Sequence, residues 1–172
     1  GKLAVFQDPA FMADPLAGNA GGAYAPGQSA SNLNRLLVAW GCEMPANLLA
    51  ADPGLAIQAP AARGAATARP ATLITLKGNA IPHDGGLNTG VTRVRVFNAG
   101  TLKLKTVPGI TADTLLRTSE TGYAVRTDNL RQKASEGKEV VYLGVRLTGT
   151  FPSALAGDLA QDAPKASPEP AT

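Results

Sequence analysis

Apolar residues in this chain come in runs of only a few residues, each ending at a segment rich in glycine, proline or alanine. Such runs suit short strands and short helices. A membrane-spanning helix needs roughly 20 consecutive apolar residues, so we expect a soluble piece of chain, without a secretory leader at its start. The 172 residues leave room for one domain, and the 19 Gly and 13 Pro limit the apolar area that it can bury.

The clearest predicted element is an amphipathic helix over residues 31–40. Ser31 can cap its start, and Gly41 stands where a left-handed residue usually ends a helix. Four apolar residues recur at the spacing of one helix face: Leu33, Leu36, Leu37 and Trp40. This spacing predicts a helix with one buried face.

Strands are expected where β-branched residues cluster or where apolar and polar residues alternate. The first run is interpreted as a buried strand, and the last, rich in valine and leucine, as a central strand. Beyond residue 155 little can be buried, so we expect a disordered tail or linker over 156–172 after a domain over 1–155. The predicted strands are residues 3–6, 71–76, 92–96, 102–105 and 140–147, with a further strand-like pair at 115–120 and 123–125 broken at Gly122.

The segments 92–96 and 102–105 flank Asn98-Ala99-Gly100, which predicts a hairpin with a three-residue turn. Their apolar residues would then share one face and their cations the other: Arg93, Arg95, Lys103 and Lys105. Four like charges on one small surface repel each other. The favoured interpretation is a solvated outer face, the alternative is a surface for an acidic partner or an anionic ligand, and strands that are not neighbours would remove the repulsion.

Positive charge is concentrated in the middle of the chain. Residues 61–148 carry thirteen cations and six anions, whereas each end carries a net charge of −2. The cations are scattered among acids and few aromatic residues, unlike the clustered basic footprint of a nucleic-acid-binding domain. We therefore expect no nucleic-acid partner.

One cysteine and one histidine exclude an intrachain disulfide, multi-cysteine metal sites and His-pair motifs. Cys42 follows the predicted helix instead of a strand-to-helix elbow, so it is interpreted as a small buried residue. His83 lies in the turn-rich I-P-H-D-G-G and has no evident metal-binding partner. We expect no cofactor and no metal.

Other polar residues carry weak signals. Asp8 follows a predicted strand, where it can face a ligand but more often only turns the chain. The glycine-rich region 18–27 lacks the spacing of a phosphate-binding loop. Thr118 and Ser119 can contact a ligand or serve backbone groups at a strand end. No nucleophile, base and orienting group come together, so the sequence predicts no enzyme.

Four stretches, in this order, resemble the GldG-like auxiliary components of ABC transport systems, a gliding-motility-associated family related to a domain of intraflagellar transport proteins. They are G-K-L-A-V-F-Q-D-P at 1–9, S-N-L-N-R-L-L-V-A-W-G at 31–41 followed by Ala51-Asp52, L-L-R-T-S-E at 115–120, and G-V-R-L-T-G-T-F-P-S-A at 144–154. The resemblance spans residues 1–155. The chain departs from the family pattern at both ends, lacking a preceding strand and helix and a later strand ending in G-D-x-D, so the sheet is expected to be incomplete.

The resemblance implies an α/β fold, a mixed sheet flanked by helices of the flavodoxin or glutamine-amidotransferase-like kind. It also implies an extracytoplasmic domain on the periplasmic side of the inner membrane, belonging to a protein anchored by transmembrane helices absent here. Its partners would be an ABC permease and other cell-envelope proteins, and exposed sheet edges would allow self-association.

Three functions follow. The first is a non-enzymatic interaction or sensing domain of an ABC-type export or gliding system. The second is a domain that binds carbohydrate or small anions through the loops near Asp8 and Thr118. The third, least favoured, is a hydrolase with Cys42 as nucleophile, for which no base is evident.

Overall fold

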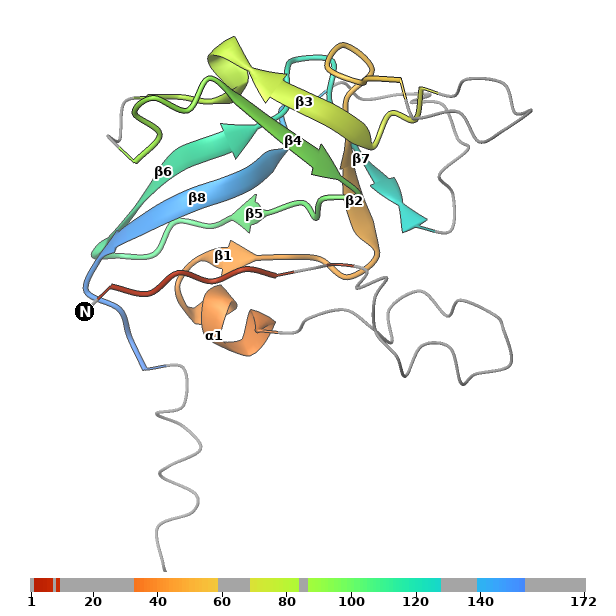
Figure 1. The fold of residues 1–172 in the computed structure, drawn as a ribbon. Helices are drawn as coiled ribbons and strands as arrows, with labels where there is room; N and C mark the ends of the chain where they lie inside the picture. Colours follow the sequence, from red (N-terminus) through yellow and green to blue (C-terminus); the bar gives the residue numbers. More distant parts are fainter. Residues whose placement is uncertain are drawn as a thin grey trace, which may run out of the picture.

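The computed structural model describes residues 2–7, Pro9, 33–58, 69–83, 87–127 and 139–153. In these segments there is one α-helix, and most of the regular structure is β (Figure 1). In chain order the elements are α1 (Asn34–Ala39), β1 (Cys42–Glu43), β2 (Leu48–Ala51), β3 (Leu73–Lys77), the 3-10 helix η2 (Gly78–Ala80), β4 (Arg93–Phe97), β5 (Lys103–Leu104), β6 (Ile110–Arg117), β7 (Tyr123–Arg126) and β8 (Tyr142–Gly149).

The strands form four two-stranded antiparallel sheets: β1–β5, β2–β7, β3–β4 and β6–β8. Single bridges join some of these sheets to neighbouring segments, Leu49 to Gly100, Ala56 to Ile74 and Leu102 to Tyr142. The predicted α/β fold with a mixed sheet between helices is therefore wrong. In the described residues no parallel pair occurs, and α1, six residues long, is too short to cover a sheet.

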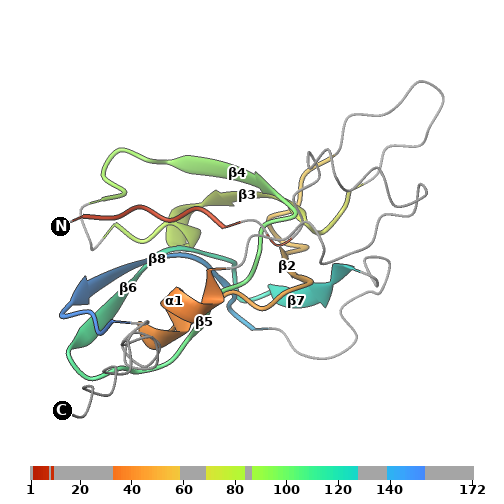
Figure 2. The same ribbon diagram turned by 90° about the horizontal axis from the view of Figure 1, so that it is seen from below.

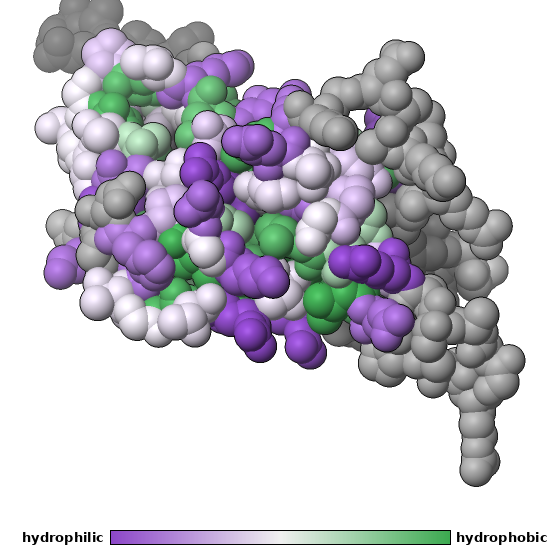
Figure 3. Space-filling model, turned by 90° about the horizontal axis from the view of Figure 1, so that it is seen from above, coloured by the Kyte–Doolittle hydropathy of each residue, from purple (hydrophilic) through white to green (hydrophobic). Residues whose placement is uncertain are grey.

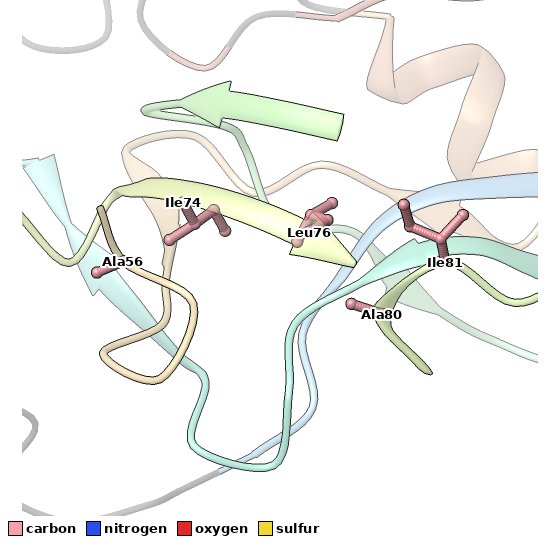
Figure 4. Packing of buried hydrophobic residues seen from close by; sticks show 5 residues of the cluster. All are labelled: Ala56, Ile74, Leu76, Ala80 and Ile81. Carbon is pink, nitrogen blue, oxygen red and sulfur yellow. The ribbon is translucent and has the colours of Figure 1, made fainter. Parts of the chain in front are cut away.

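Two of the sheets pack face to face and enclose the main core. Figures 1 and 2 show β3 and β4 lying across β6 and β8. Five buried residues, drawn in Figure 4, form its centre: Ala56, Ile74, Leu76, Ala80 and Ile81. Val94 and Val96 of β4 pack on them from one layer, and Leu116 of β6 and Leu143 of β8 from the other. Alternation along β3 and β4 thus places Ile74, Leu76, Val94 and Val96 toward the core and the cations on the opposite side, with Leu73 and Phe97.

The strand patterns at 71–76, 92–96 and 102–105 are confirmed, but the predicted hairpin between the last two is wrong. β4 pairs with β3, and β5 pairs with β1. Asn98 does have a positive φ of 52°, yet its N–H donates to Thr72 O and so extends the β3–β4 ladder. Gly100 then bridges Leu49 of β2. The chain leaves β4 for another sheet because hydrogen bonds to β2 are available there, which a local turn signal cannot reveal.

The predicted helix is confirmed in the shorter form of α1. Of the four residues expected on its buried face, Leu37 is buried, Leu36 and Trp40 are partly buried and Leu33 is 43% exposed. Gly41 has the expected left-handed backbone, with φ 78°. Leu33 takes the N-cap position without a side-chain hydrogen bond, and Ser31 lies outside the described residues. The Asn34 side chain pairs with the Met44 backbone, donating to Met44 O at 2.8 Å and accepting from Met44 N at 3.0 Å. This pair of bonds holds the start of α1 to Met44, the residue that follows β1.

The segment 2–7 is not the predicted buried strand. It has no strand assignment, and the side chains of Leu3 and Phe6 are 70% and 93% exposed. A strand needs a neighbour to bond its backbone, and no ladder reaches this segment in the described residues. Among those residues, no helix combines the length and the apolar character that crossing a bilayer requires.

Candidate functional site

The Asp52 side chain is fully buried, and both of its carboxylate oxygens accept hydrogen bonds. Its Oδ1 accepts from Gly54 N at 2.9 Å, from Leu55 N at 3.1 Å and from the Thr121 hydroxyl at 2.8 Å. Its Oδ2 accepts from Ser119 N at 2.6 Å. The carboxylate therefore closes the turn after β2 and ties that turn to the loop between β6 and β7.

Thr118 and Ser119 belong to the same structure. The Thr118 hydroxyl is buried and accepts from Val141 N at 2.9 Å. The Ser119 hydroxyl lies 2.9 Å from that of Thr121 and accepts from Thr121 N. These polar groups serve backbone and neighbouring side chains, as in the simpler of the two predicted roles. Together with Asp52 they form a structural anchor, which we call the Asp52 anchor (residues 52–55, 118–121 and 141).

A second pair of motif segments also meets in space. The Trp40 indole donates from Nε1 to Pro152 O at 3.0 Å, and its ring lies edge-on to Phe151 with centroids 4.9 Å apart. The end of α1 is thus attached to the segment that follows β8. Three of the four stretches of the sequence motif, those at 31–41 with 51–52, 115–120 and 144–154, thus meet in two contacts that hold the fold together, and the described residues of the first stretch, at 1–9, join neither.

Cys42 and His83 do not form a reactive pair. Cys42 is buried in β1, opposite Leu104, and burial raises the pKa of its thiol. His83 is exposed on the segment after η2, where Nδ1–H donates to Asn88 O at 3.0 Å. In Figure 1, β1 lies at the bottom of the molecule and the end of β3, which leads into η2, at the top. A buried, protonated thiol remote from a base is a poor nucleophile.

Other candidates stay untested. Asp8 and the glycine-rich region 18–27 lie outside the described residues. Within the described part, no three His, Cys, Asp or Glu side chains gather as metal ligands.

The outer face of β3–β4 is different, because its cations lack acidic partners among the described residues. In the register Thr75 lies opposite Arg95, Lys77 opposite Arg93 and Leu73 opposite Phe97. Directly opposite residues of an antiparallel pair point to the same side. All three cations are exposed, and Phe97 is 56% exposed beside them. We call this surface the basic face; its residues are Leu73, Lys77, Arg93, Arg95 and Phe97, and Thr75, on the same side of the strand pair, is buried among its neighbours.

The basic face differs from the other charged strand pair. Arg146 of β8 lies opposite Asp113 of β6 and bonds its Oδ2 from two nitrogens, at 3.0 and 2.6 Å. By contrast, Arg93 lies opposite Lys77, a like-charged neighbour, and no ion pair to these two cations or to Arg95 is found among the described residues. Like charges directly opposite each other are destabilising, and within the described segments no acid offsets the positive charge of this face.

The sequence predicted some residues of the basic face and not others. Alternation predicted that Arg93 and Arg95 share a side, but it grouped them with Lys103 and Lys105. Lys103 instead lies on β5, opposite Glu43, and Lys105 directly follows that strand. Lys77 was missed, although it continues the alternation Leu73, Thr75, Lys77 in β3. Figure 3, a view onto the molecule from above, shows hydrophilic residues interleaved with hydrophobic ones on that side.

A family model described as an ABC-type uncharacterized transport system matches residues 1–172, the full length of the chain. Neither the curated proteins nor the solved structures gave a match.

Proposed function

The chain belongs to this family of auxiliary components of ABC-type transport systems, and from that membership we propose that it is a non-enzymatic docking domain that binds another component of its transport system through the basic face. The resemblance found in the sequence is thereby confirmed at the level of the family. An ABC-type transport system is therefore the setting in which a partner is to be sought.

The single observation that carries the proposal is the basic face itself. It presents Lys77, Arg93 and Arg95 without a counter-charge among the described residues, next to a half-exposed phenylalanine. Interfaces are enriched in arginine and aromatic residues. The other candidate residues favour the basic face as the docking surface. Asp52, Thr118 and Ser119 already make the hydrogen bonds of the Asp52 anchor, and Cys42 is buried.

We place the domain on the extracytoplasmic side of the membrane. This part of the proposal rests on the resemblance to GldG-like components, as does any connection to gliding motility. The test is to locate the full-length protein by protease protection in intact cells and spheroplasts. Protection of the domain from protease added to spheroplasts would contradict the assignment.

Co-purification tests the docking function. The chain, with an affinity tag, is coexpressed with the permease and the ATPase of its own transport system. Recovery of at least one of them is expected, and recovery should fall when Arg93→Glu and Arg95→Glu reverse the basic face. A matched control reverses Lys103 and Lys105, which are also exposed but lie on and just after β5. Equal recovery with both double variants would remove the basic face from the interaction.

A further inference from the structure

β4 is an edge strand in the described structure, and its open side carries a defined set of backbone groups. Thr75 N donates to Leu55 O, and Ile57 N donates to Leu73 O. The odd-numbered residues of β3 therefore direct their backbone groups toward segment 55–57. The even-numbered residues of β3 must direct theirs toward β4, as the bond from Asn98 N to Thr72 O also requires.

Backbone N–H and C=O groups of successive residues point to opposite sides of a strand. The same argument therefore gives the direction of these groups along β4. Its even-numbered residues, Val94 and Val96, bond β3. The N–H and C=O groups of Arg93, Arg95 and Phe97 then point away from β3. In the parts of the chain that the structure describes, no strand or bridge meets that side of β4. Such an edge is a template for another extended segment.

The open backbone groups and the exposed cations therefore belong to the same residues. A strand that pairs antiparallel with β4 would place its residues opposite Arg93 and Arg95 on the basic face. Its alternate residues would continue the layer of Val94 and Val96, which packs on the main core. Opposite charges in directly paired positions stabilise a sheet. The edge therefore favours an incoming strand whose residues opposite Arg93 and Arg95 are acidic and whose residues between them are apolar.

We infer that the open edge of β4 binds an extended segment of a partner protein by antiparallel strand addition, and that this segment alternates acidic and apolar residues. The inference rests on the proposed docking function and names how the docking occurs. The acidic residues lie opposite Arg93 and Arg95, and their backbone groups bond the backbone of β4. Lys77, beside Arg93, adds to the positive field.

A second copy of this chain is a poorer occupant. Antiparallel pairing of two β4 edges would bring the arginines of one copy onto the arginine-bearing strand of the other, with no acid between Arg93 and Phe97. Charged side chains also guard edge strands against aggregation, but a guarding role does not explain an exposed aromatic residue in the same row. Phe97 offers a partner apolar contact area instead.

Peptide binding to the full chain provides the test. The probe is a fluorescein-labelled peptide of alternating glutamate and valine, and its control has lysine in place of glutamate. Anisotropy should show that the glutamate peptide binds and that Arg93→Glu with Arg95→Glu weakens it about tenfold or more. The Lys103→Glu and Lys105→Glu control variant should bind like the wild type. Equal affinity for both peptides would overturn the charge recognition.

Backbone methylation tests strand addition on the wild-type protein, without any risk of misfolding. In an antiparallel pair, residues opposite Arg93 and Arg95 direct their N–H groups at β4. N-methylation of the glutamates should therefore abolish binding, and N-methylation of the valines should leave it within about twofold, because their N–H groups point to solvent. Equal effects of the two modifications, or no effect of either, would overturn strand addition.

Two further results separate the alternatives. Sedimentation of the free chain should give a monomer; a dimer that dissociates on Arg95→Glu would overturn the inference in favour of a second copy. If the ABC components co-purify and the charge reversal prevents it, but the methylated peptides bind alike, strand addition fails while the proposed docking function stands.

Discussion

Replacement of Asp52 tests whether the family motifs at 51–52 and 115–120 serve the fold. The carboxylate is fully buried and accepts four hydrogen bonds, three from backbone N–H groups and one from the Thr121 hydroxyl. Asp52→Asn keeps the shape of the side chain. It places an NH₂ group at one oxygen position, so that either Ser119 N or the donors at Oδ1 face another donor.

The magnitude follows from the number of donors left without an acceptor. In the better orientation of the substituted amide its oxygen replaces Oδ1, and one bond, the 2.6 Å contact with Ser119 N, is lost. A buried donor left unsatisfied costs about 1–3 kcal/mol, so Asp52→Asn should lower the free energy of unfolding by about 2 kcal/mol. Asp52→Ala orphans three backbone donors, and water entry relieves part of the cost, so the expected loss is about 4 kcal/mol.

Urea unfolding followed by circular dichroism measures these changes, with the slope of the transition checking that the unfolded state is unaltered. Asp113→Asn is the matched control, because its carboxylate is 38% exposed and bonds a single partially exposed arginine. Exposed ion pairs contribute roughly 0.2–1 kcal/mol, so the control should change stability by no more than that. If Asp52→Asn cost no more than Asp113→Asn, the anchoring role assigned to Asp52 would be refuted.

Three further predictions concern packing and the buried thiol. Gly122→Ala should lower the free energy of unfolding by about 2–3 kcal/mol in the same urea assay, because the new methyl group would overlap the Thr118 side chain. Phe151→Ala should loosen the end of α1 at a cost of about 1 kcal/mol, seen as a red shift in the fluorescence of Trp40, the chain's single tryptophan. Burial raises the pKa of the Cys42 thiol, so its contribution to stability is full below the ordinary thiol value of 9.0 and is lost as pH rises through the higher native pKa. Alkylation of Cys42 at pH 7 should therefore be slow in the folded protein and fast in guanidinium. Fast labelling of the native protein would contradict the burial.

Local patterns predicted individual elements well where alternation or helical spacing was strong. The runs at 71–76 and 92–96 became β3 and β4, and Gly41 does end α1 with a left-handed backbone. The prediction of a buried strand at residues 3–6 was wrong, because a short apolar run does not reveal whether another strand will pair with it and cover it. Leu3 and Phe6 remain exposed for that reason.

Some neighbours within the basic face and the Asp52 anchor could be predicted from the sequence, and others could not. That Arg93 and Arg95 share a face follows from the two-residue repeat of a strand. Their true neighbour, Lys77, follows only from pairing with β3, which is set by contacts between residues far apart in the sequence. Asp52 shows the same limit, because its bond to Ser119 N joins two turns that lie in different parts of the chain.

The amino-acid sequence by itself determined the family, the position of the strong strands and the helix, and the side of each strand that is apolar, because those properties depend on residue type and local spacing. Tertiary structure decided which strands pair, and with that the all-antiparallel architecture in the described residues, the burial of Asp52 and the exposure of the β4 edge. Distant segments compete to pair through the same backbone hydrogen bonds and apolar surfaces. The sequence of one segment therefore does not determine which other segment it pairs with.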